Sequence, residues 1–513
     1  MTRTTRRLRL LAAAALLLAA AVPRPLAAQP EEASPPSAAA WLDRLAEEHW
    51  RRQLEEVPGL RIAEGLPVTR LPDFSYRHAA AAAEHAQGLL ERLAAIDPAT
   101  FDQAGDHERW LTYRILQWQA RLTVDRLPFF WHAFQVTPHG GGFAGLAEVF
   151  ARSPVASAEE RARYLDLLGQ LPRLAGELGS NLAAQRERGI LLPASEIAAV
   201  EALWAPLAAP PDRHPFRVAP ERLAGGDPAE AAAFSARVAE RLATEVAPAF
   251  AALLAVFDPG YRAAAPAEVG LGRYPGGQEA YRFLIQVHTT LDDLGPEEVH
   301  RRGLAEVARI ATEMAALRER LGSTLPAAEG HAPAPDHPVQ LALQDEDPAL
   351  PAFRRHAFPT AFVEGWGEYA SALAAETGLD EDPRGRYGRL AMDMLRSCRL
   401  VVDTGVNALG WSREQALEFL RERVLESDTR LATETLRQAV DAPARALAQT
   451  TAALAIRDLR RRAEEALGPR FDVRRFHQAV LGHGPMPLEV LAEHVEWWIA
   501  REMALPAEEP VAP

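Results

Sequence analysis

Apolar residues recur every three to four positions from Trp41 almost to the end of the chain, which is the spacing of one face of a helix. Strict alternation of apolar and polar residues, the pattern of strands, is nearly absent. Proline and glycine interrupt the helical pattern at intervals, and Pro296 followed by Glu297 and Glu298 marks the start of a helix. The pattern predicts an all-α protein built from many helices.

The first 28 residues follow a different pattern. Arginines precede an apolar run at 10–22, and the small residues at 27–28 come directly before Gln29. This is the pattern of a secretory signal peptide, and the run is shorter than the roughly twenty apolar residues that a membrane helix needs. We expect cleavage near Ala28, a periplasmic or secreted protein, and no integral membrane segment after cleavage. No cysteine follows the cleavage site to carry a lipid, and Cys398 is the single cysteine.

The rest of the chain divides by composition. We expect a signal peptide at 1–28, a linker rich in Pro, Ser and Ala at 29–40, an N-terminal helical region at 41–270, a C-terminal helical region at 271–505, and a tail at 506–513. The boundary between the two helical regions falls at a turn-forming Pro-Gly-Gly sequence.

Charge excludes several classes of function. The formal net charge is -14, and removal of the signal-peptide arginines leaves about -19. A surface this acidic disfavours nucleic acid as a partner. The chain contains no lysine, which excludes Schiff-base chemistry and a phosphate-binding P-loop.

Two histidines and a later glutamate are the residues with metal-binding chemistry. His331 and His337 lie in the Pro- and Gly-rich stretch 322–338, and Glu364 lies in the segment Phe362–Tyr369, which is typical of a helix. Zinc enzymes that hydrolyse amides combine two His with a third ligand, and a Glu acts as general base on the zinc-bound water. On spacing alone, two His in a Pro-rich segment are more often exposed loop residues.

Several stretches of the C-terminal region carry a resemblance to a known family: 281–294, 297–314, 362–369, 399–411 and 459–491. In these stretches the chain resembles the bacterial family catalogued as domain of unknown function 885, which is regarded as related to gluzincin-type zinc metallopeptidases. The resemblance implies a large, multi-helix, peptidase-like fold in which the N-terminal and C-terminal regions flank a cleft. It also implies zinc as the cofactor and a peptide or protein as substrate or ligand.

The family signature, H-E-A-x-P-G-H-H-x-Q followed by F-x-E-G-W-A-L-Y, assigns roles to individual residues. It implies His331, His337 and Glu364 as metal ligands. The position of the general base is Ala332 in this chain. A shifted alignment offers Glu329 as a substitute, and Glu368, one helical turn after Glu364, is the other candidate.

The cleft residues implied by the resemblance are His288, Asp403 and Asn407, the last in place of a His that ends the family sequence D-T-G-x-H. Taken without the family, Asp403 could instead form a buried structural pair with Arg399 on the same helix.

Other departures from the family pattern accumulate. A Tyr-Lys pair of the family is replaced by Gln449 and Thr450, and only sixteen residues separate Met314 from His331, where the family has a long segment. Losing one positioned acid or base costs roughly a hundredfold to ten-thousandfold in rate. We therefore expect a catalytically impaired member that binds a peptide or a partner protein. The alternative is an active zinc-dependent peptidase with a non-standard base.

Overall fold

The structure is a computed structural model that describes residues 37–103, 105–138, 141–321, 350–356, 359–376 and 383–505. Every regular element in these ranges is a helix, which confirms the prediction of an all-α, multi-helix fold. The predicted signal peptide, most of the predicted linker and the tail lie outside the described residues.

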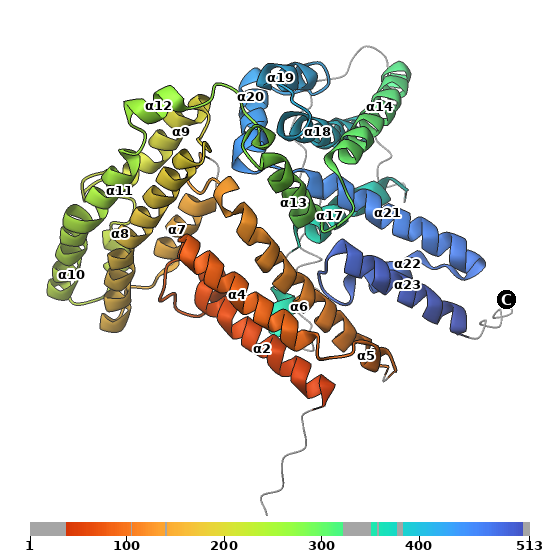
Figure 1. Ribbon diagram of the computed structural model, residues 1–513, viewed down its shortest axis with the longest axis horizontal. Coiled ribbons are helices and arrows are strands. Elements are labelled where there is room, and N and C mark those ends of the chain that lie inside the picture. Colours follow the sequence, from red (N-terminus) through yellow and green to blue (C-terminus); the bar gives the residue numbers. More distant parts are fainter. Residues whose placement is uncertain are drawn as a thin grey trace, which may run out of the picture.

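The N-terminal region begins with three helices that lie side by side in Figure 1: α2 (Ala38–Glu56), α4 (Tyr76–Leu93) and α6 (His107–Arg126). Side chains that accept hydrogen bonds from first-turn N–H groups start many of the helices, including Ser75 before α4 and Asp106 before α6. The remaining elements are α3 (Pro58–Ala63), α5 (Ala99–Gln103), η1 (Leu127–His132), α7 (Gly141–Arg152), α8 (Ala158–Glu187), α9 (Ala194–Trp204), η2 (Ala205–Ala208), η3 (Pro220–Leu223), α10 (Pro228–Arg241), the π-helical turn η4 (Leu242–Val246), α11 (Ala247–Leu254) and α12 (Pro259–Ala264).

The C-terminal region contains η5 (Leu271–Arg273), α13 (Gly277–Thr289), α14 (Pro296–Leu321), α16 (Ala352–Arg355), α17 (Thr360–Glu376), α18 (Pro383–Asn407), α19 (Arg413–Arg421), α20 (Asp428–Leu436), the π-helical turn η6 (Arg437–Asp441), α21 (Leu447–Leu467), η7 (Gly468–Arg470), α22 (Val473–Leu481) and α23 (Leu488–Ala504). Helix α14 begins at Pro296, as predicted, and the segment Phe362–Tyr369 lies within α17, also as predicted.

The hydrophobic core combines the two regions. One cluster contains residues of α2, α4 and α6 together with residues of α17, α21, α22 and α23, including Leu45, Leu116, Phe362 and Ile456. A second cluster contains residues of α8, α10 and α11 together with residues of α14 and α18, such as Val401. The N-terminal and C-terminal regions, which lie before and after the Pro-Gly-Gly turn in sequence, therefore bury apolar side chains in the same two clusters.

Close packing between helices fixes the position of α17. A Cβ atom at Gly365 of α17 would clash with Ala452 of α21, so only glycine allows the two helices to approach this closely. A Cβ atom at Gly303 of α14 would lie 2.8 Å from Cβ of Leu400 in α18, with the same consequence. These two helix pairs form the frame on which the candidate site is built (Figure 1).

One described segment, Pro228–Ala264, is long and apolar enough to cross a membrane by length and composition alone. It comprises α10, η4, α11 and α12, and α10 and α11 pack along α8. Its large apolar side chains, Phe234, Val238 and Phe250, are buried in the core. The fold thus uses the large apolar side chains of this segment as packing surface.

Candidate functional site

A cavity of about 140 Å³ lies in the C-terminal region between α17, α18, α20 and the start of α21. Its lining is rich in charged side chains. The charged and amide side chains around it include Glu364 of α17, Arg399 of α18, Glu434 of α20, Arg437 and Gln438 of η6, and Arg445 just before α21.

One wall of the cavity is a hydrogen-bonded chain of side chains. Arg399 Nε donates to Glu434 Oε1 at 2.7 Å, and Gln438 Nε2 donates to the same oxygen at 2.7 Å. Gln438 is only 3% exposed, and its Oε1 has no hydrogen-bond partner. The sequence-based alternative that Arg399 pairs with Asp403 is wrong, because Arg399 binds Glu434 on another helix.

Three charged groups at the cavity have no hydrogen-bonded or ion-paired partner among the described residues. Glu364, Arg437 and Arg445 form no hydrogen bond or ion pair through their side chains with any residue in the described ranges. Both arginines are exposed, and Glu364 is half-buried. The cavity therefore presents two guanidinium groups and one carboxylate that are free to meet a ligand.

Asp403 and Asn407 lie directly behind the turn that carries Arg445, and both are wholly buried. Asp403 accepts hydrogen bonds from Tyr281 Oη at 2.6 Å and from the N–H of Ala444 at 3.0 and 3.1 Å. Asn407 Oδ1 accepts from the N–H of Leu271 at 2.8 Å. Neither residue lines the cavity: Asp403 holds the Ala444 turn, and Asn407 bonds to Leu271.

Ala444 adopts φ = 64°, in the left-handed region that non-glycine residues rarely occupy. The buried carboxylate of Asp403 holds this conformation by binding the Ala444 N–H through both oxygens. Burial raises the pKa of Asp403 to about 7, against the hydrogen bonds from Tyr281 and Ala444, which lower it. Strained backbone of this kind persists where surrounding contacts impose it, often beside functional sites.

His288 of α13 is linked to the cavity through Arg445. Burial lowers the pKa of His288 to about 4, and the positive charges of Arg445 and Arg126 add to the decrease. His288 is therefore neutral at pH 7, and one of the two cations that act on it, Arg445, lines the cavity.

Of the two candidates for a substitute base, Glu368 lies within the described residues. It lies one turn after Glu364 on α17 and is 7% exposed. Burial raises its pKa to about 7. Thr450 Oγ1 donates a hydrogen bond to Glu368 Oε2 at 3.1 Å across the packed pair α17 and α21. The carboxyl group does not line the cavity that contains Glu364.

The other residues expected at a zinc site, His331, His337 and Glu329, lie outside the described residues. Within the described part of the chain, no group of three or more His, Cys, Asp or Glu side chains is placed to hold a metal ion. Glu364 shares its cavity with the unpaired cations Arg437 and Arg445. Because these positive charges oppose a dication, the described side chains around Glu364 do not fit a zinc ion.

Three residues of the cavity were not predicted from the sequence: Arg437, Gln438 and Arg445. Arg445 lies inside the stretch 443–452 that aligns with the family, beside Gln449, which replaces the family Tyr and lines the same cavity. The absence of lysine from the chain is the sequence signal that points to them, because a positive side chain that binds an anion must then be arginine or protonated histidine.

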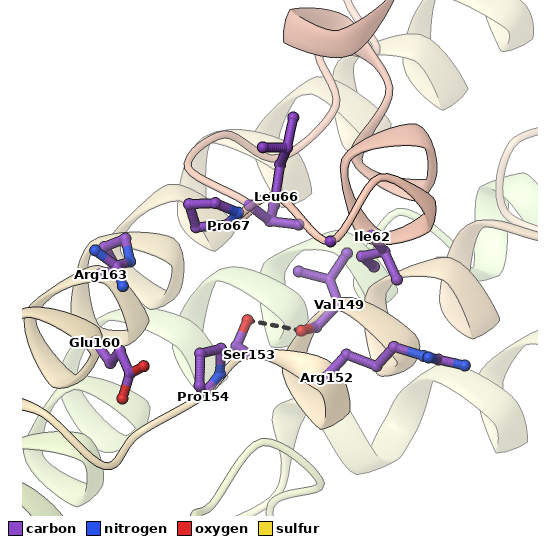
Figure 2. A pocket seen from close by; sticks show the side chains of 11 residues that line it. Ile62, Leu66, Pro67, Val149, Arg152, Ser153, Pro154, Glu160 and Arg163 are labelled. Atoms are coloured by element: carbon purple, nitrogen blue, oxygen red, sulfur yellow. Dashed lines mark hydrogen bonds between the residues drawn. The ribbon is translucent and has the colours of Figure 1, made fainter. Parts of the chain in front are cut away.

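A larger hollow lies in the N-terminal region, between the turn after α3, the end of α7 and the start of α8 (Figure 2). Its volume is about 530 Å³. Its polar groups serve the fold: Ser153 Oγ donates to Val149 O at 2.7 Å, and Glu160 accepts from the N–H of Ser157 at 2.8 Å at the start of α8. Arg163 pairs with Glu159. This hollow offers no group suited to catalysis.

The fold and the site define an all-helical protein with a small, cation-rich cavity among its C-terminal helices. The profile of a bacterial family of proteins of unknown function (DUF885) matches residues 58–332 and 323–495. The chain therefore belongs to this family. No curated protein matches the chain.

Two solved structures share the fold. One, described as "the putative lipoprotein from Colwellia psychrerythraea", has a TM-score of 0.80 and 20% sequence identity, and the match covers 91% of this chain and 100% of that chain. The other, "a putative lipoprotein of unknown function from Shewanella oneidensis", has a TM-score of 0.66 and 13% identity, and covers 90% and 99%. At these identities the likeness concerns the fold.

Proposed function

We propose that the protein is an exported family member that binds a peptide or a partner protein through a peptidase-like scaffold and has lost efficient cleavage. The observation that carries the proposal is the environment of Glu364. The residue that the family resemblance assigns as a metal ligand lines a cavity with two unpaired arginines. Such a cavity suits the recognition of a charged ligand better than the binding of a dication.

The loss of cleavage is supported by the sequence around the family signature. The position of the general base is Ala332, and no described side chain beside Glu364 replaces it. The two matched segments of the family profile meet at residues 323–332, where the chain is expected to be shortened. One lost base accounts for a rate decrease of roughly a hundredfold to ten-thousandfold.

Export is supported by the signal-peptide pattern of residues 1–28. The two solved structures with this fold are described as those of lipoproteins, which are exported proteins of the cell envelope. The residue directly after the expected cleavage site is Gln29, not a cysteine that could carry a lipid. We therefore place it in the periplasm or the medium, without a lipid anchor.

The proposal is tested with the purified mature protein, by metal analysis, a peptide-library digestion and a peptide-library binding assay. We expect peptide binding without turnover. Stoichiometric zinc together with turnover that Glu364→Ala abolishes would contradict the proposal. Glu418→Ala is the matched control, because Glu418 is an exposed glutamate of α19 with no ion pair among the described residues.

The second candidate, an active zinc-dependent peptidase with a non-standard base, has one observation in its favour. The pKa of Glu368 is raised to about 7, a value suited to a group that exchanges protons near neutral pH. If this candidate is correct, Glu368→Gln abolishes turnover while leaving peptide binding intact. Absence of turnover in the unaltered protein loaded with zinc would remove it.

A further inference from the structure

We infer that the cavity beside Glu364 binds the free α-carboxylate end of an amino-acid unit, with Arg437 and Arg445 holding the carboxylate and Gln438 accepting an N–H group. The inference rests on the proposed function, since it names the part of a ligand that the scaffold recognises. The unit is either a free amino acid or the C-terminal residue of a peptide.

The two arginines contrast with many of their neighbours in an acidic protein. Many other arginines of the C-terminal region have carboxylate partners, such as Arg399 with Glu434 and Arg421 with Asp428. Arg437 and Arg445 form no ion pair with a described residue, although the formal net charge is -14. Two unpaired guanidinium groups at one small cavity attract an anion, and their planar N–H groups match the two oxygens of a carboxylate.

Gln438 supplies a second feature that calls for a ligand. Its Nε2 donates to Glu434, so its Oε1 is the atom left without a hydrogen-bond partner, in a residue that is 3% exposed and lines the cavity. A buried acceptor without a donor costs free energy. The N–H of an amino-acid unit whose carboxylate lies against the arginines would satisfy it.

The backbone favours the same ligand. Helix α21 begins at Leu447, and the N–H groups of Leu447 and Ala448 donate to the carbonyl oxygens of Ala444 and Arg445. The N-cap residue, Ala446, lines the cavity, so the positive end of the helix dipole adds to the charge of the arginines there. Asp403 holds the preceding turn at Ala444, which keeps Arg445 in place before a ligand arrives.

The volume limits what can enter. A cavity of about 140 Å³ is well below the roughly 300–1,000 Å³ of sites that enclose drug-sized ligands. One residue of a peptide therefore fits, and the rest of the peptide would extend outside. The unpaired carboxylate of Glu364 is the group that distinguishes the two sources, because a free amino acid carries an ammonium group and a C-terminal residue does not.

The test uses the mature full-length protein, isothermal titration calorimetry and three probes: tri-alanine with a free C-terminus, tri-alanine C-terminal amide, and L-alanine. We expect at least one of the two free carboxylates to bind about tenfold or more tighter than the amide. Arg445→Gln and Arg437→Gln should each weaken that binding by about tenfold while leaving the amide unchanged. Both arginines are exposed, so the variants should keep their melting temperature.

Arg474→Gln is the control, since it removes the same charge from a side chain that is 89% exposed on α22. Equal binding of acid and amide, or an equal loss in Arg474→Gln, overturns the inference and leaves peptide binding intact. Binding of L-alanine through Arg445 without binding of tri-alanine supports the site and contradicts the peptide ligand of the proposed function. If none of the probes binds, the inference fails, while the peptide-library assay still decides the proposed function.

Discussion

Asp403 supports the turn that carries Arg445 to the cavity. It lies behind the cavity and holds the Ala444 turn through both carboxylate oxygens, while Tyr281 donates to it from α13. Its function is therefore to place Arg445. A wholly buried carboxylate of this kind is costly to desolvate, and the fold compensates by surrounding it with donors.

Asp403→Ala should destabilise the protein by about 2–4 kcal/mol, because it leaves buried donors of Tyr281 and Ala444 without an acceptor. Urea unfolding measures the effect. Asp428→Ala is the control, since the Asp428 side chain is 73% exposed in its pair with Arg421 and should matter by less than about 1 kcal/mol. Equal effects of the two substitutions would show that Asp403 does not hold the turn.

Glu368 gives a prediction of pH dependence. Its pKa in the folded protein is about 7, above the ordinary value of 4.5, so the folded state favours the protonated carboxyl. The stability of the natural protein relative to Glu368→Gln should therefore fall as the pH rises from about 4.5 to about 7, by on the order of 3 kcal/mol, and then level off. Urea unfolding of both proteins across this range measures it, and a constant difference would contradict the assignment.

For single residues, the sequence was a better guide to which side chains lie at the site than to the residues with which they form ion pairs or hydrogen bonds. Glu364 was expected on a helix and lies on α17. Arg399 was paired with Asp403 as an alternative, because both lie on one helix, but its partner comes from α20. Arg445 escaped notice because a lone arginine in sequence looks like a solvated charge, and its position depends on the turn at Ala444.

At the scale of elements, the site depends on the contact between α17 and α21. Gly365 lets the two helix backbones approach closely. Helix α17 carries Glu364 at the cavity, and the start of α21 lies at the same cavity. The π-helical turn η6 also shapes the site, because it carries Arg437 and Gln438. Asn407 Nδ2 donates to the carbonyl oxygen of Gln438 within this turn at 3.1 Å, which compensates for the interrupted helical pattern.

Gly365→Ala should destabilise the protein by about 1–3 kcal/mol, because the added methyl group overpacks the contact with Ala452. Thermal unfolding measures the change. Gly385→Ala, near the start of α18, is the control: a Cβ there meets no atom within 4 Å, and the higher helix propensity of alanine should leave stability unchanged or raise it. Equal melting temperatures for the two variants would contradict the close packing.

Helix positions were predictable because caps and prolines act locally, as Pro296 at the start of α14 shows. The π-helical turn η6 was not predictable from local sequence signals of this kind. Its geometry depends on Asn407, which is distant in sequence and reaches Gln438 only after α18 and α20 have packed together. Local propensity contains no information on such a contact.

At the scale of the whole molecule, the order of helices along the chain differs from their grouping in space. The predicted regions 41–270 and 271–505 contribute to common cores, and α6 packs against α23 near the C-terminal end of the described chain. The apolar stripe of a helix shows that it must be buried, but does not identify its partner. The family resemblance supplied the overall architecture, which periodicity alone could not.

The contact between α6 and α23 predicts how the stability of the protein responds to acid. His107 Nε2 and His494 Nδ1 lie 2.8 Å apart, and His494 Nε2 lies 2.9 Å from the carbonyl oxygen of Ala479. His494 is wholly buried, and its Nε2 donates to that carbonyl, which leaves Nδ1 to accept from His107. Burial lowers the pKa of His494 to about 3, and the neighbouring His483 and His107 add to the decrease.

Because the folded state disfavours protonated His494, while the unfolded chain takes up a proton near pH 6.5, stability should fall as the pH decreases from about 6.5 toward 3. Relative to His494→Gln, the natural protein should lose on the order of 4 kcal/mol over this range. Urea unfolding at several pH values measures the difference. His78→Gln is the control, since His78 is only partly buried in the first turn of α4, whereas His494 is wholly buried. A pH-independent difference between the natural protein and His494→Gln would show that the contact does not exclude the proton.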